Sequence, residues 1–195
     1  MSLKKQISSI LLMFIITTIP VASSVLAQQG GMSDSYKLLK SVKDKNYSEL
    51  RNYLQKGTNV NTRDYNDGET PLYLATLEKD KVMVTFLLAS NANTDLSVKS
   101  TGETPLMVAV RLRAHEILKM LISQNADLNI KDKNGETALY KAVQLNDRTS
   151  VKELLDAKAD WALADNTGRT PYDLTLENRR LRSIQGMLEE AGAEY

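Results

Sequence analysis

Gly68-Glu69-Thr70-Pro71-Leu72 is the stretch that decides the fold, because close copies of it recur three more times along the chain. The copies are Gly102-Glu103-Thr104-Pro105-Leu106, Gly135-Glu136-Thr137-Ala138-Leu139 and Gly168-Arg169-Thr170-Pro171-Tyr172. Their glycines are spaced 34, 33 and 33 residues apart. A nearly fixed period of this size is typical of a repeat array, in which each unit buries its apolar face against its neighbours.

The residues of the motif predict the local structure of each unit. A glycine supplies a turn conformation with positive φ, and a threonine hydroxyl can accept a hydrogen bond from an unpaired N–H at a helix start. Proline suits the first helical position, and Leu72 and Ala75 follow at a helical spacing of three. A second apolar stretch then runs to Asn91, Asn125 or Lys158, where a left-handed helix cap is expected. Each unit is therefore predicted to be a turn, a short helix, a longer helix and a cap.

This pattern resembles that of the ankyrin repeat family, from about residue 34 to the end of the chain. The resemblance implies an all-α ankyrin-repeat solenoid of about five helix-turn-helix repeats, which are linked by β-turn or hairpin loops. The expected repeats span about residues 34–66, 67–100, 101–133, 134–166 and 167–195. The first unit lacks the Thr-Pro start and the last has a polar second helix, so both are interpreted as caps of the array.

The turns depart from the family pattern in two ways. The histidine that usually follows Thr-Pro-Leu, and ties neighbouring turns together, is replaced by Tyr73, Met107, Tyr140 and Asp173. The first two turns are one residue longer than the others, at 65–67 and 99–101. The last unit also has one extra residue around 178–181 and places Glu189 where an apolar residue usually lies. These changes predict individual turn tips on an unchanged fold.

Residues 1–27 have the composition of a secretory signal peptide. Lys4 and Lys5 precede an apolar run from Ile10 to Ile19, and a small residue, Ala27, lies just before the expected cleavage site. The run is shorter than the roughly 20 apolar residues of a membrane-spanning helix. We therefore expect an exported protein, located in the periplasm or outside the cell, with residues 28–33 as a disordered lead-in.

Charge and cysteine content exclude several classes of function. The full chain has 25 Lys and Arg against 24 Asp and Glu, and removal of residues 1–27 leaves 23 against 24, a net charge of −1. This balance argues against bulk electrostatic binding to nucleic acid or to an anionic membrane. The absence of cysteine excludes disulfides, thiolate nucleophiles and cysteine-ligated zinc, and it is compatible with an oxidising compartment.

Candidate catalytic and ligand-binding groups are few. His115 is the single histidine, and nothing near it in the sequence supplies a nucleophile and an orienting partner. The segment around Asp132 lacks the ligand spacing of a calcium loop, and Asp132 instead matches the aspartates at 64 and 165 that brace turns. Trp161 is expected either to pack between repeats or to anchor an interface. We expect no metal, no cofactor and no enzyme activity.

The resemblance places a protein partner in a concave groove, which is formed by the turn tips and by exposed positions of the first helices. The candidate partner-binding residues are Tyr65, Asn66, Glu69, Leu77, Glu78, Lys99, Glu103, Arg111, Leu112, Lys133, Glu136, Gln144, Leu145 and Arg169. The residue after each turn glycine gives a row of three acids and one base. Two interpretations of the three leucines stay open: the exposed apolar centre of a binding site, or partial burial between crowded helices.

The expected function is therefore an exported, non-catalytic module that binds one protein partner through this groove, as a periplasmic accessory or immunity-type protein. The alternative is a secreted effector that binds host proteins. We expect a monomer with no nucleic-acid partner and no stable membrane anchor after cleavage. An enzyme is disfavoured because no set of nucleophile, base and orienting group can be assembled from these residues.

Overall fold

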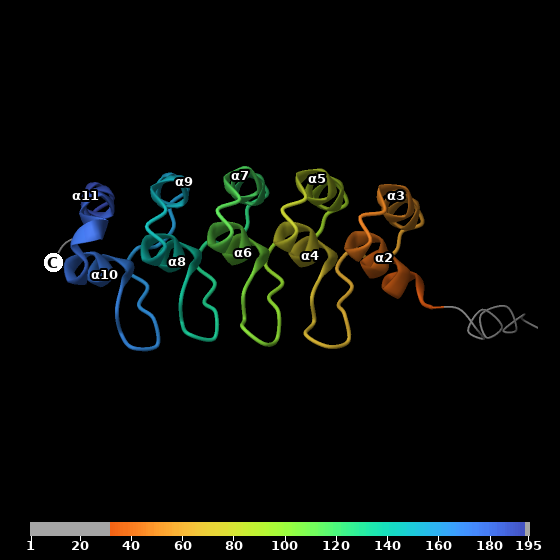
Figure 1. Cartoon of the computed structure of the whole chain (residues 1–195), viewed down its shortest axis with the longest axis horizontal. Coiled ribbons are helices and arrows are strands. Elements are labelled where there is room, and N and C mark those ends of the chain that lie inside the picture. Colours follow the sequence, from red (N-terminus) through yellow and green to blue (C-terminus); the bar gives the residue numbers. More distant parts are fainter. Residues whose placement is uncertain (1–31, 194–195) are drawn as a thin grey trace, which may run out of the picture. The chain divides into compact units, whose positions relative to one another are not determined.

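The computed structural model describes residues 32–193, in which five pairs of helices follow one another along the chain (Figure 1). The first helices are α2 (Asp34–Lys43), α4 (Pro71–Leu77), α6 (Pro105–Arg111), α8 (Ala138–Gln144) and α10 (Pro171–Glu177). The second helices are α3 (Tyr47–Gln55), α5 (Lys81–Ala89), α7 (His115–Ser123), α9 (Arg148–Asp156) and α11 (Arg182–Glu190), with a short 3-10 helix, η2 (Arg179–Leu181), before α11. The expected signal peptide, and residues 28–31 of the expected lead-in, lie outside the described residues.

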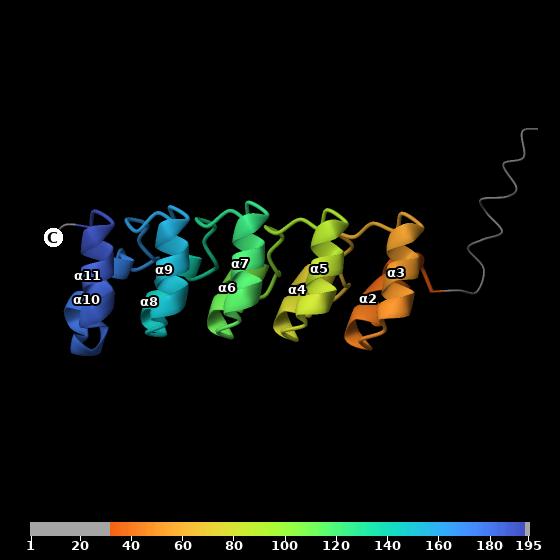
Figure 2. The ribbon, with the colours of Figure 1, turned by 90° about the horizontal axis from the view of Figure 1, so that it is seen from above.

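Residues 33–193 form two layers of helices with hairpin loops projecting from one side. Figure 1 shows the first helices in one row, the second helices in a row above them, and four long loops below. Seen from above, each helix pair lies beside the next in the order of the sequence (Figure 2). The predicted all-α solenoid is thus confirmed for the described part of the chain. Within that part, no helix has the length and apolar character needed to span a bilayer.

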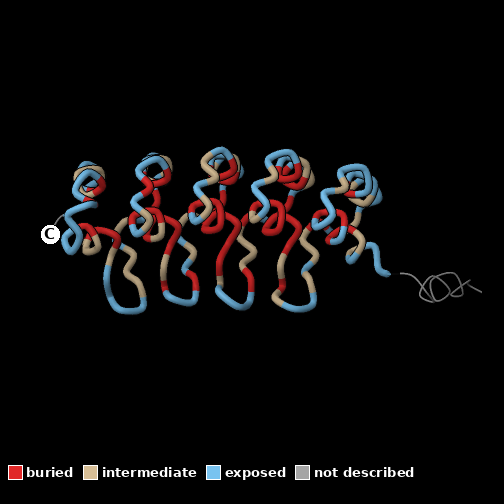
Figure 3. Tube along the Cα trace, in the orientation of Figure 1, coloured by how far each residue is buried: buried red, intermediate tan, exposed pale blue. Residues whose placement is uncertain are grey.

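The core is a continuous row of apolar side chains between successive helix pairs. Leu72, Leu106 and Leu139, at the start of three first helices, are each at most 1% exposed, and Leu118 and Leu154 on second helices are fully buried. Figure 3 shows this burial concentrated where the pairs meet, while the loop tips are exposed. Full burial of a leucine side chain stabilises the fold by about 1.5–3 kcal/mol, so the stacking of neighbours dominates the stability of each unit.

The motif residues take the roles that their chemistry predicts. Thr70, Thr104, Thr137 and Thr170 each accept a hydrogen bond from a backbone N–H three residues later, at 3.2–3.4 Å. These contacts start the first helices, and a substitution to alanine at such a cap costs about 1 kcal/mol. At the other end, Asn91, Asn125 and Lys158 have φ between 58° and 69°, which confirms the left-handed caps after the second helices.

The structure corrects the expected start of the ordered domain. Ser33, which the sequence places in a disordered lead-in, is instead the N-cap of α2, and its hydroxyl accepts a hydrogen bond from the Tyr36 N–H at 3.2 Å.

At the other end of the array, the extra residue of the last unit is accommodated by η2. The connection between α10 and α11 therefore differs from the four earlier connections, where Lys45, Lys79, Arg113 or Asn146 adopts a positive φ of 51–53°.

Candidate functional site

Aspartates shape three of the four hairpin loops. Asp64, Asp132 and Asp165 each accept hydrogen bonds at Oδ1 from two backbone N–H groups of their own turn, at 2.8–3.1 Å. A carboxylate that accepts two N–H bonds closes a turn in one geometry. This confirms the structural role expected for Asp132. The remaining turn has Val98 at this place, and its side chain is buried instead.

The hairpins are joined to one another near their tips. Backbone hydrogen bonds run from Lys99 N to Asp67 O (2.8 Å), from Lys133 N to Thr101 O (2.9 Å) and from Asn166 N to Asn134 O (2.9 Å). The approach is so close that a Cβ atom at Gly135 would lie 2.6 Å from the Asn166 nitrogen, so glycine is required there. The tips therefore form a continuous strip with fixed spacing between side chains.

The row of residues after the turn glycines is neutralised by partners on the first helices. The pairs are Glu69 with Lys43 (3.4 Å), Glu103 with Arg111 (3.1 and 3.2 Å), Glu136 with Lys141 (2.8 Å) and Arg169 with Glu177 (3.3 Å). Three acids and one base thus become four ion pairs, and the strip carries no net acidic charge from this row. Of the other candidates on first helices, Glu78 binds Lys45 (3.1 Å) and Gln144 is exposed.

Lys141 is the most enclosed cation of this surface. Its ammonium lies 2.7 Å from Asp132 Oδ2 and 2.8 Å from Glu136 Oε2, and all three side chains are nearly buried. Burial disfavours the charged amine, but the two hydrogen bonds outweigh it and raise the pKa of Lys141 above its usual value. Beside this network lies a hollow of about 710 Å³, which is lined by first-helix side chains such as Tyr73 and Arg111 and by the hairpin tips.

The two tyrosines that replace the usual histidine behave differently, and only Tyr140 takes over its role of tying neighbouring turns together. The Tyr140 hydroxyl donates a hydrogen bond to Asp165 Oδ2 at 2.7 Å, which ties α8 to the next hairpin. Burial and this bond raise the pKa of Tyr140 to about 12. Tyr73 occupies the equivalent position on α4, but it packs against buried Val98 and Val108 instead. A tyrosine therefore ties the turn by hydrogen bonding only where the next hairpin supplies an aspartate.

The three groove leucines are partly buried. Leu77 and Leu112 pack on the cluster of Tyr73, Val98 and Val108, while Leu145 packs on the main core. The interpretation of an exposed row of leucines is therefore wrong, and crowding between helices explains their positions. Trp161 also packs partly buried against the core, as one of its two interpretations expects.

Comparison with known proteins supports the same organisation. A family model described as "Ankyrin repeats (3 copies)" matches residues 38–132 and 113–195. The chain belongs to the ankyrin repeat family. No curated protein matches it. Ankyrin repeats imply a protein–protein interaction module that is typically non-catalytic.

His115 occupies a structural position in the ankyrin array. Its Nε2 lies 2.9 Å from Asp147 Oδ2, and Ser150 Oγ donates to the same oxygen at 2.7 Å. In a catalytic triad the serine would contact the histidine, whereas here both contact the aspartate. Burial raises the pKa of Asp147, but the bonds from Ser150 and His115 outweigh it and keep that pKa below its usual value. Among residues 32–193, no three potential metal ligands gather in one place.

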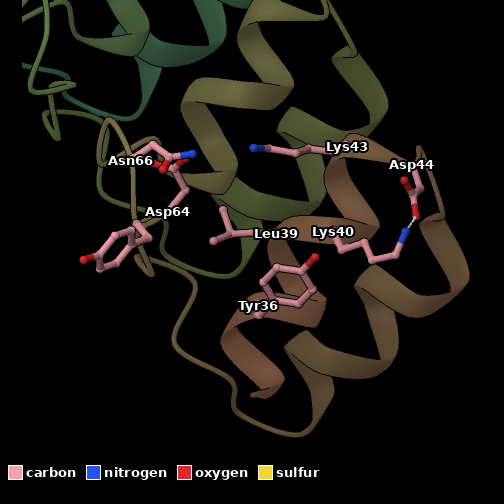
Figure 4. A pocket seen from close by; sticks show the side chains of 8 residues that line it. Tyr36, Leu39, Lys40, Lys43, Asp44, Asp64 and Asn66 are labelled. Carbon is pink, nitrogen blue, oxygen red and sulfur yellow. Dashed lines mark hydrogen bonds and ion pairs between the residues drawn. The ribbon is translucent and has the colours of Figure 1, made fainter. Parts of the chain in front are cut away.

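Two exposed tyrosines lie at the N-terminal end of the array, one on the first hairpin and one on α2. Tyr65, at the tip of the first hairpin, is 96% exposed, and Tyr36 on α2 is 50% exposed. Both line a pocket of about 400 Å³ whose floor includes Leu39, with Lys43 reaching across toward Asn66 and Asp64 (Figure 4). Sequence reasoning found Tyr65 and Asn66 but missed Tyr36. The available signal was that the first unit lacks the Thr-Pro start that opens the first helices of later units.

Proposed function

We propose that this protein is an exported, non-catalytic module that binds one protein partner along the hairpin strip and the first helices, with its anchor at the N-terminal pocket. Export is inferred from the layout of residues 1–27, where two lysines precede an apolar run and a small residue precedes the cleavage site. The partner is then met in the periplasm or outside the cell. The roles of periplasmic accessory, immunity-type protein and secreted effector share this binding surface.

The exposure of Tyr65 is the observation that carries the proposal. A tyrosine side chain that is 96% exposed at the tip of a hydrogen-bonded hairpin contributes little to the fold. Tyrosine buries a large area on binding with little loss of side-chain freedom, and it is common among the residues that dominate binding energy. Together with Tyr36 and Leu39 it supplies an apolar centre, and Lys40, Lys43 and Asn66 supply a polar rim.

The remainder of the strip favours a polar contact surface. The ion pairs of Glu103 and Glu136 are formed before any partner arrives, so they present fixed charges at fixed distances. Lys99 and Lys133 are exposed at successive tips, and neither has a carboxylate within ion-pair distance in residues 32–193. A partner that extends from the pocket along the tips would meet these two ammonium groups. Such preformed polar contacts set specificity more than affinity.

The test compares two variants in the native host. The processed protein carrying Tyr65→Ala should lose its co-purifying partner, with affinity reduced about thirtyfold or more, as expected for a dominant interface tyrosine. Val82→Ala is the matched control, because Val82 is 55% exposed on α5 and lies outside the pocket lining. Isothermal titration with the identified partner measures both affinities.

A partner retained equally by wild type, Tyr65→Ala and Val82→Ala would contradict the anchor at the N-terminal pocket. Loss of the partner in both variants would indicate binding on the second helices and would contradict the proposed surface. Cell fractionation of the same strains tests export. We expect the protein in the periplasm or the medium, with residues 1–27 removed, and full-length protein in the cytoplasm would overturn this part of the proposal.

A further inference from the structure

The starts of the second helices form a ladder of contacts between neighbouring units. Tyr47 Oη donates to Asp80 Oδ2 at 2.7 Å, and Lys81 Nζ lies 3.0 Å from Glu116 Oε2. His115 Nε2 lies 2.9 Å from Asp147 Oδ2. In each case the first residue of one second helix contacts an acid at the start of the next. At three successive junctions between neighbouring second helices, α3–α5, α5–α7 and α7–α9, a carboxylate at the start of the later helix makes this contact.

The last junction has no such acid. Arg148 is the first residue of α9, and the matching positions at the start of α11 are Leu181, Arg182 and Ser183. Two more arginines, Arg179 and Arg180, lie in η2, the connection that distinguishes the last unit. The last junction therefore carries four arginines, one at the start of α9 and three in η2 and at the start of α11, where the earlier junctions hold cation–acid or hydroxyl–acid pairs.

These four arginines, here called the arginine edge (Arg148, Arg179, Arg180 and Arg182), are exposed and uncompensated. The arginines that form ion pairs within residues 32–193 are Arg111, Arg113 and Arg169. No member of the arginine edge is among them, and all four are exposed. Uncompensated cations on adjacent units repel one another, and only solvent and salt screen them here.

A hollow adjoins the arginine edge. It has a volume of about 730 Å³ and is lined by residues of α9 and α11 and of the segments that follow them, and Arg148 is the member of the arginine edge that lines it. Leu155 and Met187 contribute apolar contact within it, and two carboxylates, those of Asp156 and Glu190, also line it. The hollow lies on the second helices, whereas the N-terminal pocket is lined by α2 and the first hairpin.

We propose that the arginine edge binds an acidic segment of a protein, at a site separate from the hairpin strip. Guanidinium groups bind carboxylates through paired N–H bonds, so several of them on one edge favour successive Asp or Glu side chains. No aromatic side chain lines the hollow to stack on a base, which favours an acidic protein segment over a nucleic acid.

The first experiment measures binding of a fluorescent oligo-glutamate peptide by anisotropy at low and at physiological salt. Arg179→Gln/Arg180→Gln should weaken binding about tenfold or more, because hydrogen bonds to charged groups are lost. The control is Lys56→Gln/Lys79→Gln, which changes the net charge by the same amount on exposed lysines elsewhere. Tyr65→Ala should bind the peptide as wild type does, which separates this site from the one under Proposed function.

Three results would overturn the inference. The first is no binding of the peptide by the wild-type protein at low salt. The second is an equal loss in the arginine and lysine double variants, which would indicate attraction by net charge alone. The third is tighter binding of a single-stranded oligonucleotide of equal charge, or of vesicles rich in anionic lipid, than of the peptide. Circular dichroism spectra of all variants should match wild type, because every substituted side chain is exposed.

Discussion

A single hydroxyl shows how this chain replaces the usual histidine of its family. Tyr140 is 1% exposed, and its hydroxyl reaches Asp165, whose Oδ1 already holds the turn. Tyr140→Phe removes the donor while keeping the ring, so we expect a loss of about 1.5–3 kcal/mol in the free energy of unfolding. Urea denaturation near neutral pH measures it. Tyr53→Phe, which alters a half-buried tyrosine with no hydrogen bond of this kind, should change the free energy by less than about 0.5 kcal/mol.

The contribution of Tyr140 should depend on pH in a definite direction. Its pKa rises from 10.0 to about 12 in the folded state. A group whose folded pKa is raised stabilises the fold fully below the unfolded value, and this contribution is lost as pH rises from 10 to 12. The stability difference between wild type and Tyr140→Phe should therefore be constant up to about pH 10 and shrink above it. A difference that stays constant up to pH 12 would contradict the buried, hydrogen-bonded phenol.

At the same scale, the sequence predicts which residues replace the histidine but not what each one does. Tyr73 and Tyr140 occupy equivalent positions, yet one packs on Val98 and the other binds Asp165. The difference depends on a residue 25 positions later, in the next hairpin. The burial of Leu112 was likewise left open, because periodicity gives the phase of a side chain and not the distance to its neighbours.

At the scale of elements, the connection between paired helices is strained in four of the five units. Lys45, Lys79, Arg113 and Asn146 adopt the left-handed conformation, which costs a residue with a side chain roughly 1–2 kcal/mol. Lys79 is exposed and has no ion pair within residues 32–193. Lys79→Gly should therefore raise the free energy of unfolding by about 0.5–1 kcal/mol, since part of the gain is offset by the flexibility of glycine in the unfolded chain.

The matched substitution is Lys79→Ala, which removes the same charge and keeps the strained backbone. Thermal unfolding of both variants separates the two effects. We expect the melting temperature to rise only for Lys79→Gly, and an equal rise in both would attribute the gain to charge instead of backbone conformation.

The hairpins show which elements the sequence predicts well. Turn glycines, threonine caps and the longer first two turns depend on a few adjacent residues, and all are found as expected. The backbone hydrogen bond that closes the turn spans five residues in the first hairpin, from Asp64 N to Glu69 O, and four in the third, from Asp132 N to Glu136 O. The bonds between hairpins, such as Lys133 N to Thr101 O, depend on how far each unit is displaced along the stack. The N-terminal pocket joins α2 to the first hairpin, and the arginine edge joins α9 to η2 and α11, so the full set of residues in each depends on how neighbouring units stack.

On the scale of the whole molecule, stability is expected to follow from contacts between adjacent units only. Leu118 on α7 and Leu188 on α11 are both fully buried, so each substitution to alanine should cost about 2–5 kcal/mol locally. The central unit has neighbours on both sides, whereas α11 contacts one preceding unit through α9. A defect in the centre therefore weakens two interfaces, and a defect at the end weakens one.

Amide hydrogen exchange distinguishes these outcomes. In Leu188→Ala, protection should fall in α10 and α11 and remain near the wild-type level in α4 to α7, because the last unit can open alone. In Leu118→Ala, protection should fall across α4 to α9, since a linear array loses its cooperativity where the central contacts fail. Equal loss of protection everywhere in both variants would indicate that residues 33–193 unfold as one cooperative block, and would contradict a stack held together by its nearest neighbours.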